Sequence, residues 1–79
     1  MKLEKKNILV AGSGNITGIN IIKALVVSEH NFVIGCDFNE LNPANKYCEN
    51  LVVSKCNLKS YLNEILKIID DYKINYIFT

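Results

Sequence analysis

The sequence has no tryptophan, a single proline and a single histidine among its 79 residues. Its three cysteines are odd in number and lack the close paired spacing of a zinc site or a disulfide framework, so they are expected to be reduced thiols. No apolar run is long enough for a signal-peptide core or a membrane span. We therefore expect a cytoplasmic protein that holds no metal and does not enter a membrane.

The chain also lacks an excess of charge of either sign. Nine basic and eight acidic side chains leave a net charge of +1, and they are scattered along the sequence. A protein that binds nucleic acid usually carries a basic patch, so no nucleic-acid partner is expected. Hydrophobic residues make up 49% and charged residues 22% of the chain, which is typical of one small globular domain.

Short apolar runs alternate with longer segments of helical periodicity. The runs that predict buried strands of a parallel sheet are Ile8–Ala11, Phe32–Cys36, Leu51–Ser54 and Asn75–Phe78. Apolar residues spaced by three and four predict helices from Ile16 to about Ser28 and from Asn57 to Tyr72, and the first of these should be more than half buried. Asn42 and Pro43 predict a short helical turn that continues to about Tyr47.

This order of elements predicts an α/β fold of the Rossmann-like, three-layer kind. We expect a parallel four-stranded sheet with strand order 3-2-1-4 and helices on both faces, because parallel strands need right-handed crossover connections. The nearest simple architecture is one mononucleotide-binding half of a doubly wound sheet.

A glycine-rich turn follows the first apolar run and opens the first helix. Its glycines, Gly12, Gly14 and Gly18, have the spacing Gly-x-Gly-x-x-x-Gly. The first glycine allows a tight turn, the second lets the backbone approach a ligand, and the third lets the helix pack closely on the sheet. Free N–H groups at the helix start favour a phosphate or a carboxylate. The turn thus predicts an anion-binding loop, although the same glycines would also suit a strand–helix corner that binds nothing.

Four further residues complete the candidate binding site. Ser13 belongs to the loop, and Asn15 and Thr17 would add side-chain hydrogen bonds to a ligand. Asp37 follows the second strand about 20 residues after the glycines, where an acidic group often accepts a hydrogen bond from a ribose hydroxyl. We assign no catalytic residue, because the lone His30 lies in an expected surface turn without a Ser or Cys partner nearby.

Nearly the whole chain resembles the N-terminal domain of ATP-grasp enzymes related to the carbamoyl-phosphate synthase large chain. The likeness lies in residues 7–28, in Val33–Asp37, and above all in the Asn-Pro-Ala-Asn-Lys-Tyr segment at 42–47. It continues through the third strand, the second long helix and the fourth strand. In that family this domain precedes the ATP-grasp. The resemblance implies that the three glycines hold a carboxylate substrate or its acyl phosphate, and that Asp37 closes the pocket.

By the same resemblance, the full enzyme would use ATP and Mg²⁺, bound by later domains, to activate a carboxylate and join it to an amine or another nucleophile. Residues 1–79 are then expected to be a single pre-ATP-grasp domain, a fragment that is inactive alone. Its partners would be a small-molecule carboxylate and the remaining domains of its own enzyme. The apolar edge of the fourth strand, Tyr76–Phe78, is expected to promote self-association.

Two other interpretations remain open. Nucleotide-sugar epimerases and short-chain dehydrogenases share the Gly-x-Gly-x-x-x-Gly spacing and an acidic residue after the second strand. In the first interpretation, the chain is the NAD(P)-binding N-terminal half of such an enzyme. It is also compatible with a stand-alone α/β interaction module that has no catalytic activity.

Overall fold

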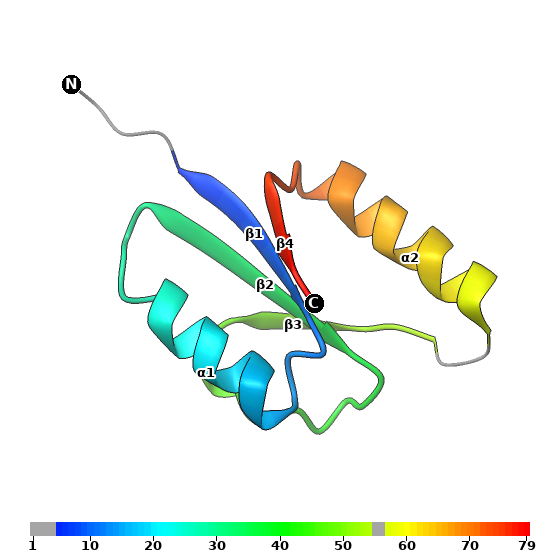
Figure 1. Cartoon of the computed structure of the whole chain (residues 1–79), viewed down its shortest axis with the longest axis horizontal. Coiled ribbons are helices and arrows are strands. Elements are labelled where there is room, and N and C mark those ends of the chain that lie inside the picture. The colour runs from blue at the N-terminus through cyan, green and yellow to red at the C-terminus, as the bar shows by residue number, and fades with distance from the viewer. Residues whose placement is uncertain (1–4, 55–56) are drawn as a thin grey trace.

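The computed structural model describes residues 5–54 and 57–79. They form a parallel sheet between two helices. Its elements in chain order are β1 (Lys6–Ala11), α1 (Ile16–Leu25), β2 (Asn31–Asp37), the 3₁₀ turn η1 (Pro43–Lys46), β3 (Glu49–Val52), α2 (Leu58–Asp71) and β4 (Tyr76–Phe78). All strand pairs are parallel, and the strand order is β3-β2-β1-β4. Figure 1 shows α1 and α2 on opposite sides of the sheet. The predicted fold class and strand order are therefore confirmed.

Side chains of β1 alternate between two apolar cores. Ile8 and Val10 belong to the core on the α1 side, together with Ile22, Val33 and Ala44. Leu9 belongs to the core on the α2 side, together with Ile34, Cys36, Val53 and Ile68. Because successive strand residues point to opposite faces, a strand covered on both sides must be apolar throughout. This is why β1 and β2 have continuous apolar runs.

The elements begin and end a few residues away from the predicted positions. β1 begins at Lys6, which pairs with Asn31 of β2. α1 ends at Leu25 rather than near Ser28, because the side-chain amide of Asn31 donates a hydrogen bond to the Leu25 carbonyl oxygen. β3 runs from Glu49 to Val52 rather than from Leu51 to Ser54, and the Ser54 N–H donates to the Glu64 carboxylate instead of a sheet partner.

The helices are less buried than the apolar pattern predicted. The expectation that α1 is more than half buried is wrong, because only Gly18 and Ile22 are buried and Val27, after its end, is 84% exposed. The apolar side of α2 divides into two rows. One row packs on the sheet through Tyr61, Ile65, Ile68 and Tyr72, while the other is exposed and consists of Leu58, Leu62 and Leu66. A four-stranded sheet is too narrow to cover both rows.

Candidate functional site

The glycine loop connects β1 to α1 at the carboxyl end of the sheet. The N–H groups of Gly12 and Ser13 both donate to the carbonyl oxygen of Cys36 in β2, at 2.9 and 3.1 Å. Gly12 has a φ of 75°, which residues with a side chain rarely adopt. The turn predicted at the first glycine is therefore present, and its start is fixed to the neighbouring strand.

The other two glycines allow close contacts inside the protein. A Cβ atom on Gly18 would collide with the carbonyl oxygen of Gly12, so α1 packs directly on the loop backbone. A Cβ atom on Gly14 would lie 2.5 Å from the Asp37 carboxylate and 3.2 Å from the Asn42 amide oxygen. The second glycine thus makes room for two side chains of the protein itself, a role that the sequence pattern had suggested for a ligand.

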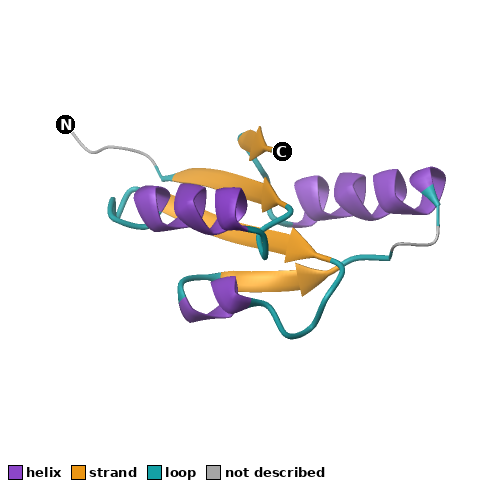
Figure 2. Ribbon diagram, turned by 60° about the horizontal axis from the view of Figure 1, so that its bottom comes forward, coloured by secondary structure: helices purple, strands orange, loops and turns teal. Residues whose placement is uncertain are grey.

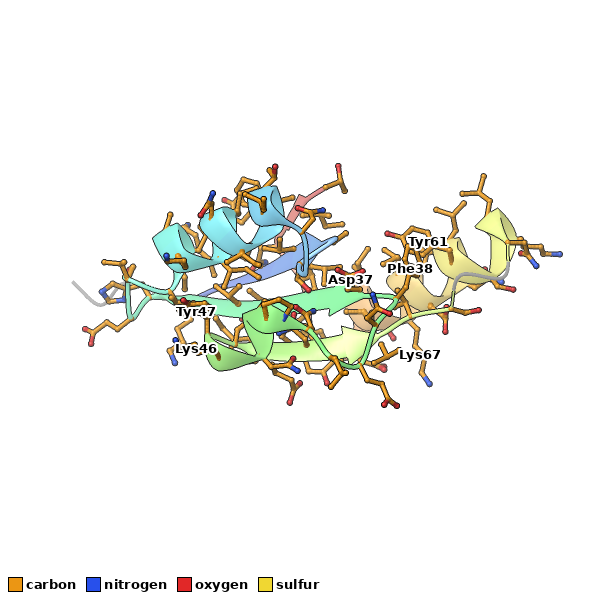
Figure 3. All side chains as sticks on the ribbon, turned by 90° about the horizontal axis from the view of Figure 1, so that it is seen from below. Asp37, Phe38, Lys46, Tyr47, Tyr61 and Lys67 are labelled. Atoms are coloured by element: carbon orange, nitrogen blue, oxygen red, sulfur yellow. The ribbon has the colours of Figure 1, made fainter. Side chains whose placement is uncertain are left out.

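Asp37 is the last residue of β2, and its carboxylate is hydrogen-bonded to the backbone. One oxygen accepts from the Gly14 N–H and the other from the Phe38 N–H, each at 2.7 Å. Figure 3 shows Asp37 near Phe38, whose ring packs against Tyr61 with 5.8 Å between centroids. Both carboxylate oxygens therefore already have an intramolecular donor, and one of them stabilises the loop.

Ser13 and Asn42 form a buried polar contact beneath the loop. Ser13 is completely buried, and its hydroxyl oxygen accepts a hydrogen bond from the Asn42 side-chain amide at 2.8 Å. The Asn42 amide oxygen accepts from the Ala44 N–H, so Asn42 also caps η1 as predicted. A capping pattern depends on local spacing and gives no information about a distant partner. For this reason the sequence did not reveal the contact with Ser13.

The first turn of α1 leaves two backbone donors without a partner. Asn15 caps the helix, because its side-chain oxygen accepts from the Gly18 N–H at 2.7 Å. Within residues 5–54 and 57–79, the N–H groups of Ile16 and Thr17 have no hydrogen-bond acceptor. At a helix N-terminus such groups point outward along the axis, where they can bind an anion or water.

A cavity of about 600 Å³ opens beside this first turn. It is bounded by the glycine loop, by α1 and by the end of β4, and its lining residues are Ala11, Gly14, Asn15, Ile16, Thr17, Gly18, Ile21, Phe78 and Thr79. Four of the predicted site residues line it, namely Gly14, Asn15, Thr17 and Gly18. The other three, Gly12, Ser13 and Asp37, do not. The contribution of Ile21 and Phe78 was not predicted, because a strand order gives the neighbours of each strand but not the space left between them.

Titratable groups contribute little to this cavity. Burial raises the pKa of the Cys36 thiol to about 11, so this cysteine is a neutral core residue at pH 7. Among the residues that the structure describes, no three His, Cys, Asp or Glu side chains gather as metal ligands. In the same part of the chain, no helix is both long and apolar enough to cross a membrane.

The cavity lining offers donors rather than reactive groups. The N–H groups of Ile16 and Thr17 and the Thr17 hydroxyl are suited to a small anion, and Ile21 and Phe78 provide an apolar wall. No protein-family model matches the chain, and no curated protein matches it. Its function is therefore inferred from the geometry of the loop and the cavity.

Proposed function

We propose that the chain is the substrate-side domain of an ATP-grasp carboxylate–amine ligase similar to the carbamoyl-phosphate synthase large chain. The observation that carries this proposal is the position of the free donors. Ile16 and Thr17, whose N–H groups have no acceptor among the described residues, line the cavity beside β4, whereas the N–H groups of Gly12, Ser13 and Gly14 are bonded within the protein. Two adjacent N–H donors at a helix start suit a carboxylate or the phosphate of an acyl phosphate.

The size and lining of the cavity support a small substrate. Small-molecule sites usually have volumes of roughly 300–1,000 Å³, and this cavity has about 600 Å³. The Thr17 hydroxyl would add a hydrogen bond to the anion, while the ring of Phe78 would cover the substrate's carbon atoms. In the proposed enzyme, ATP and Mg²⁺ are held by other domains and supply the phosphoryl group. This domain binds and orients the anion and is inactive in isolation.

NAD(P) binding by the N-terminal half of an epimerase or short-chain dehydrogenase is the second candidate. It is favoured by the position of Asp37, which ends β2 next to the glycine loop. Against it, each carboxylate oxygen of Asp37 already accepts a backbone N–H, so a ribose hydroxyl would have to share an occupied acceptor. A non-catalytic interaction module is the third candidate.

A calorimetric titration separates these candidates. We expect acetyl phosphate to bind weakly, with a dissociation constant of about 1 mM, and NAD and NADP to give no binding heat. The matched variant is Asp37→Asn, which keeps an oxygen that accepts from Gly14, so binding of acetyl phosphate should persist. NAD binding that disappears in Asp37→Asn would contradict the ligase proposal and favour a dehydrogenase. If neither acetyl phosphate nor a dinucleotide binds, the interaction module becomes the preferred candidate.

A further inference from the structure

β4 is an edge strand whose outer side has no partner among the described residues. It pairs with β1 on one side only, in the order β3-β2-β1-β4. Its three residues are all exposed, with Tyr76 at 51%, Ile77 at 44% and Phe78 at 40%. An open edge with apolar side chains invites pairing with another strand.

The two edges of the sheet differ in how well they are protected. β3, at the opposite edge, begins with the charged Glu49 and has η1 packed beside it, as Figure 2 shows. Charged residues and a covering element both discourage edge pairing. β4 carries no charged residue. The unprotected edge is therefore the one formed by β4.

The backbone directions of β4 follow from its pairing with β1. The N–H groups of Lys6 and Gly12 donate to the carbonyl oxygens of His30 and Cys36, so these alternate residues of β1 face β2. Leu9, between them in the alternation, faces β4, where it is in register with Ile77. In a parallel ladder, the backbone groups of alternate residues point to the same side. Of two residues in register in a parallel pair, only one bonds to the partner strand, and here it is Leu9. The N–H and C=O groups of Tyr76 and Phe78 thus face β1, and those of Ile77 face the open edge.

We propose that two copies of the chain associate through β4, in antiparallel pairing about a two-fold axis at Ile77. In this register Tyr76 lies opposite Phe78 of the second copy, and Phe78 lies opposite its Tyr76. Ile77 and Ile77 of the second copy exchange two backbone hydrogen bonds at the axis, because their outward-facing groups meet. The two-fold axis thereby satisfies every outward backbone group of the strand at once.

The side chains of β4 suit the same register. Tyr76 and Phe78 are in register with Ile8 and Val10, so they lie on the α1 side and form aromatic cross-strand pairs with the second copy. Ile77 is in register with Leu9 on the α2 side, where it meets Ile77 of the second copy. The Tyr76–Phe78 pairs exchange no hydrogen bonds, and residues in such pairs are especially close. The three residues of β4 carry no charge that would oppose its own copy across the axis.

The interface is small, so the association should be weak. Three half-exposed side chains from each copy bury about 500 Å² in total, below the roughly 1,200 Å² of a stable complex. The pair should therefore dissociate on dilution. This inference does not rest on the proposed function, although Phe78 belongs both to the cavity wall and to the paired edge.

Sedimentation equilibrium of the wild-type chain tests the association directly. From about 10 µM to about 1 mM protein, the average mass should rise from the monomer value of 8.9 kDa toward twice that value. Amide resonances recorded over the same range should shift mainly at Tyr76, Ile77 and Phe78. A constant mass of 8.9 kDa, or shifts confined to Leu62 and Leu66 of α2, would overturn the proposal.

Charge substitutions at Ile77 test the two-fold axis. Ile77→Lys and Ile77→Glu should each remain monomeric, because position 77 faces itself and like charges repel. An equimolar mixture of the two should regain the association, because the opposed charges then attract. The controls are Leu41→Lys, at a loop position 93% exposed, and Leu66→Lys on α2, at a position 62% exposed. Both should associate like the wild type. A mixture that stays monomeric, or loss of association in Leu66→Lys alone, would overturn the proposal.

Discussion

The two sides of the glycine loop serve different purposes. On the β2 side, the N–H groups of Gly12, Ser13 and Gly14 are bonded to Cys36 and Asp37. On the β4 side, Ile16 and Thr17, whose N–H groups have no acceptor among the described residues, line a cavity of about 600 Å³. A glycine-rich sequence therefore identifies a loop without identifying which side of it is available to a ligand. In this protein one side stabilises the fold and the other is open.

The largest expected effect comes from filling the contact between α1 and the loop. Gly18→Val would place methyl groups against the Gly12 carbonyl oxygen, which already excludes a Cβ. We expect the free energy of unfolding to fall by about 3 kcal/mol or more, or the chain to remain unfolded. Ala24→Val is the control, because Ala24 is exposed on the same helix and the change should cost under about 1 kcal/mol. Denaturant titration measures both, and equal losses would contradict the close packing described above.

The next effect concerns pH and the burial of Cys36. Burial raises the pKa of the Cys36 thiol in the folded protein from its ordinary 9.0 to about 11, so the unfolded chain loses this proton first as the pH rises. Between pH 9 and pH 11 the free energy of unfolding should fall by roughly 2–3 kcal/mol through this group. The variant Cys36→Ala should lack that part of the decline, while the tyrosines contribute equally in both proteins. Parallel stability curves for the two proteins would show that the thiol is not buried.

Removing the buried amide beneath the loop should have a somewhat smaller effect. Asn42→Ala leaves the Ser13 hydroxyl without its donor and removes the cap of η1. We expect a loss of about 2 kcal/mol in unfolding free energy. The control Asn45→Ala removes only an exposed contact to the Glu40 carbonyl oxygen and should cost under about 0.5 kcal/mol. Thermal unfolding compares the two variants, and similar melting temperatures would count against the importance of the Ser13–Asn42 contact.

The smallest effect on stability should come from the open side of the loop. Ile16→Pro removes a free N–H at the first helical position, where proline is well tolerated. The preceding Asn15 is already extended, with ψ at 168°, as proline requires. Stability should change by under about 0.5 kcal/mol, while affinity for acetyl phosphate falls about five-fold. Ile16→Ala keeps the N–H and should bind like the wild type. Equal affinity of the wild type, Ile16→Pro and Ile16→Ala for acetyl phosphate would show that the Ile16 N–H does not bind the anion.

The sequence predicted the order of the elements better than the extent of their burial. Apolar runs and helical periodicity gave the strand order and placed Asp37 at the carboxyl end of β2, because these depend on local pattern and connection rules. Periodicity shows which side of a helix is apolar but not how much of it a narrow sheet covers. The exposed row of Leu58, Leu62 and Leu66 was therefore not predicted.

The candidate site was predicted in part for a similar reason. Gly14, Asn15, Thr17 and Gly18 line the cavity because they follow β1 directly and begin α1. The sequence could not show that Asp37 would be bonded to Gly14, or that Asn42 would reach Ser13, because both contacts depend on how β2 and η1 lie beside the loop.

The most direct test is an NMR titration of the ¹⁵N-labelled chain with acetyl phosphate. If the open side of the loop is the anion site, the amide resonances of Ile16 and Thr17 should shift progressively, and those of Gly14 and Phe38, whose N–H groups are bonded to Asp37, should move little. Saturating shifts at Gly14 and Phe38, with Ile16 and Thr17 unchanged, would contradict the account and place the ligand on the β2 side.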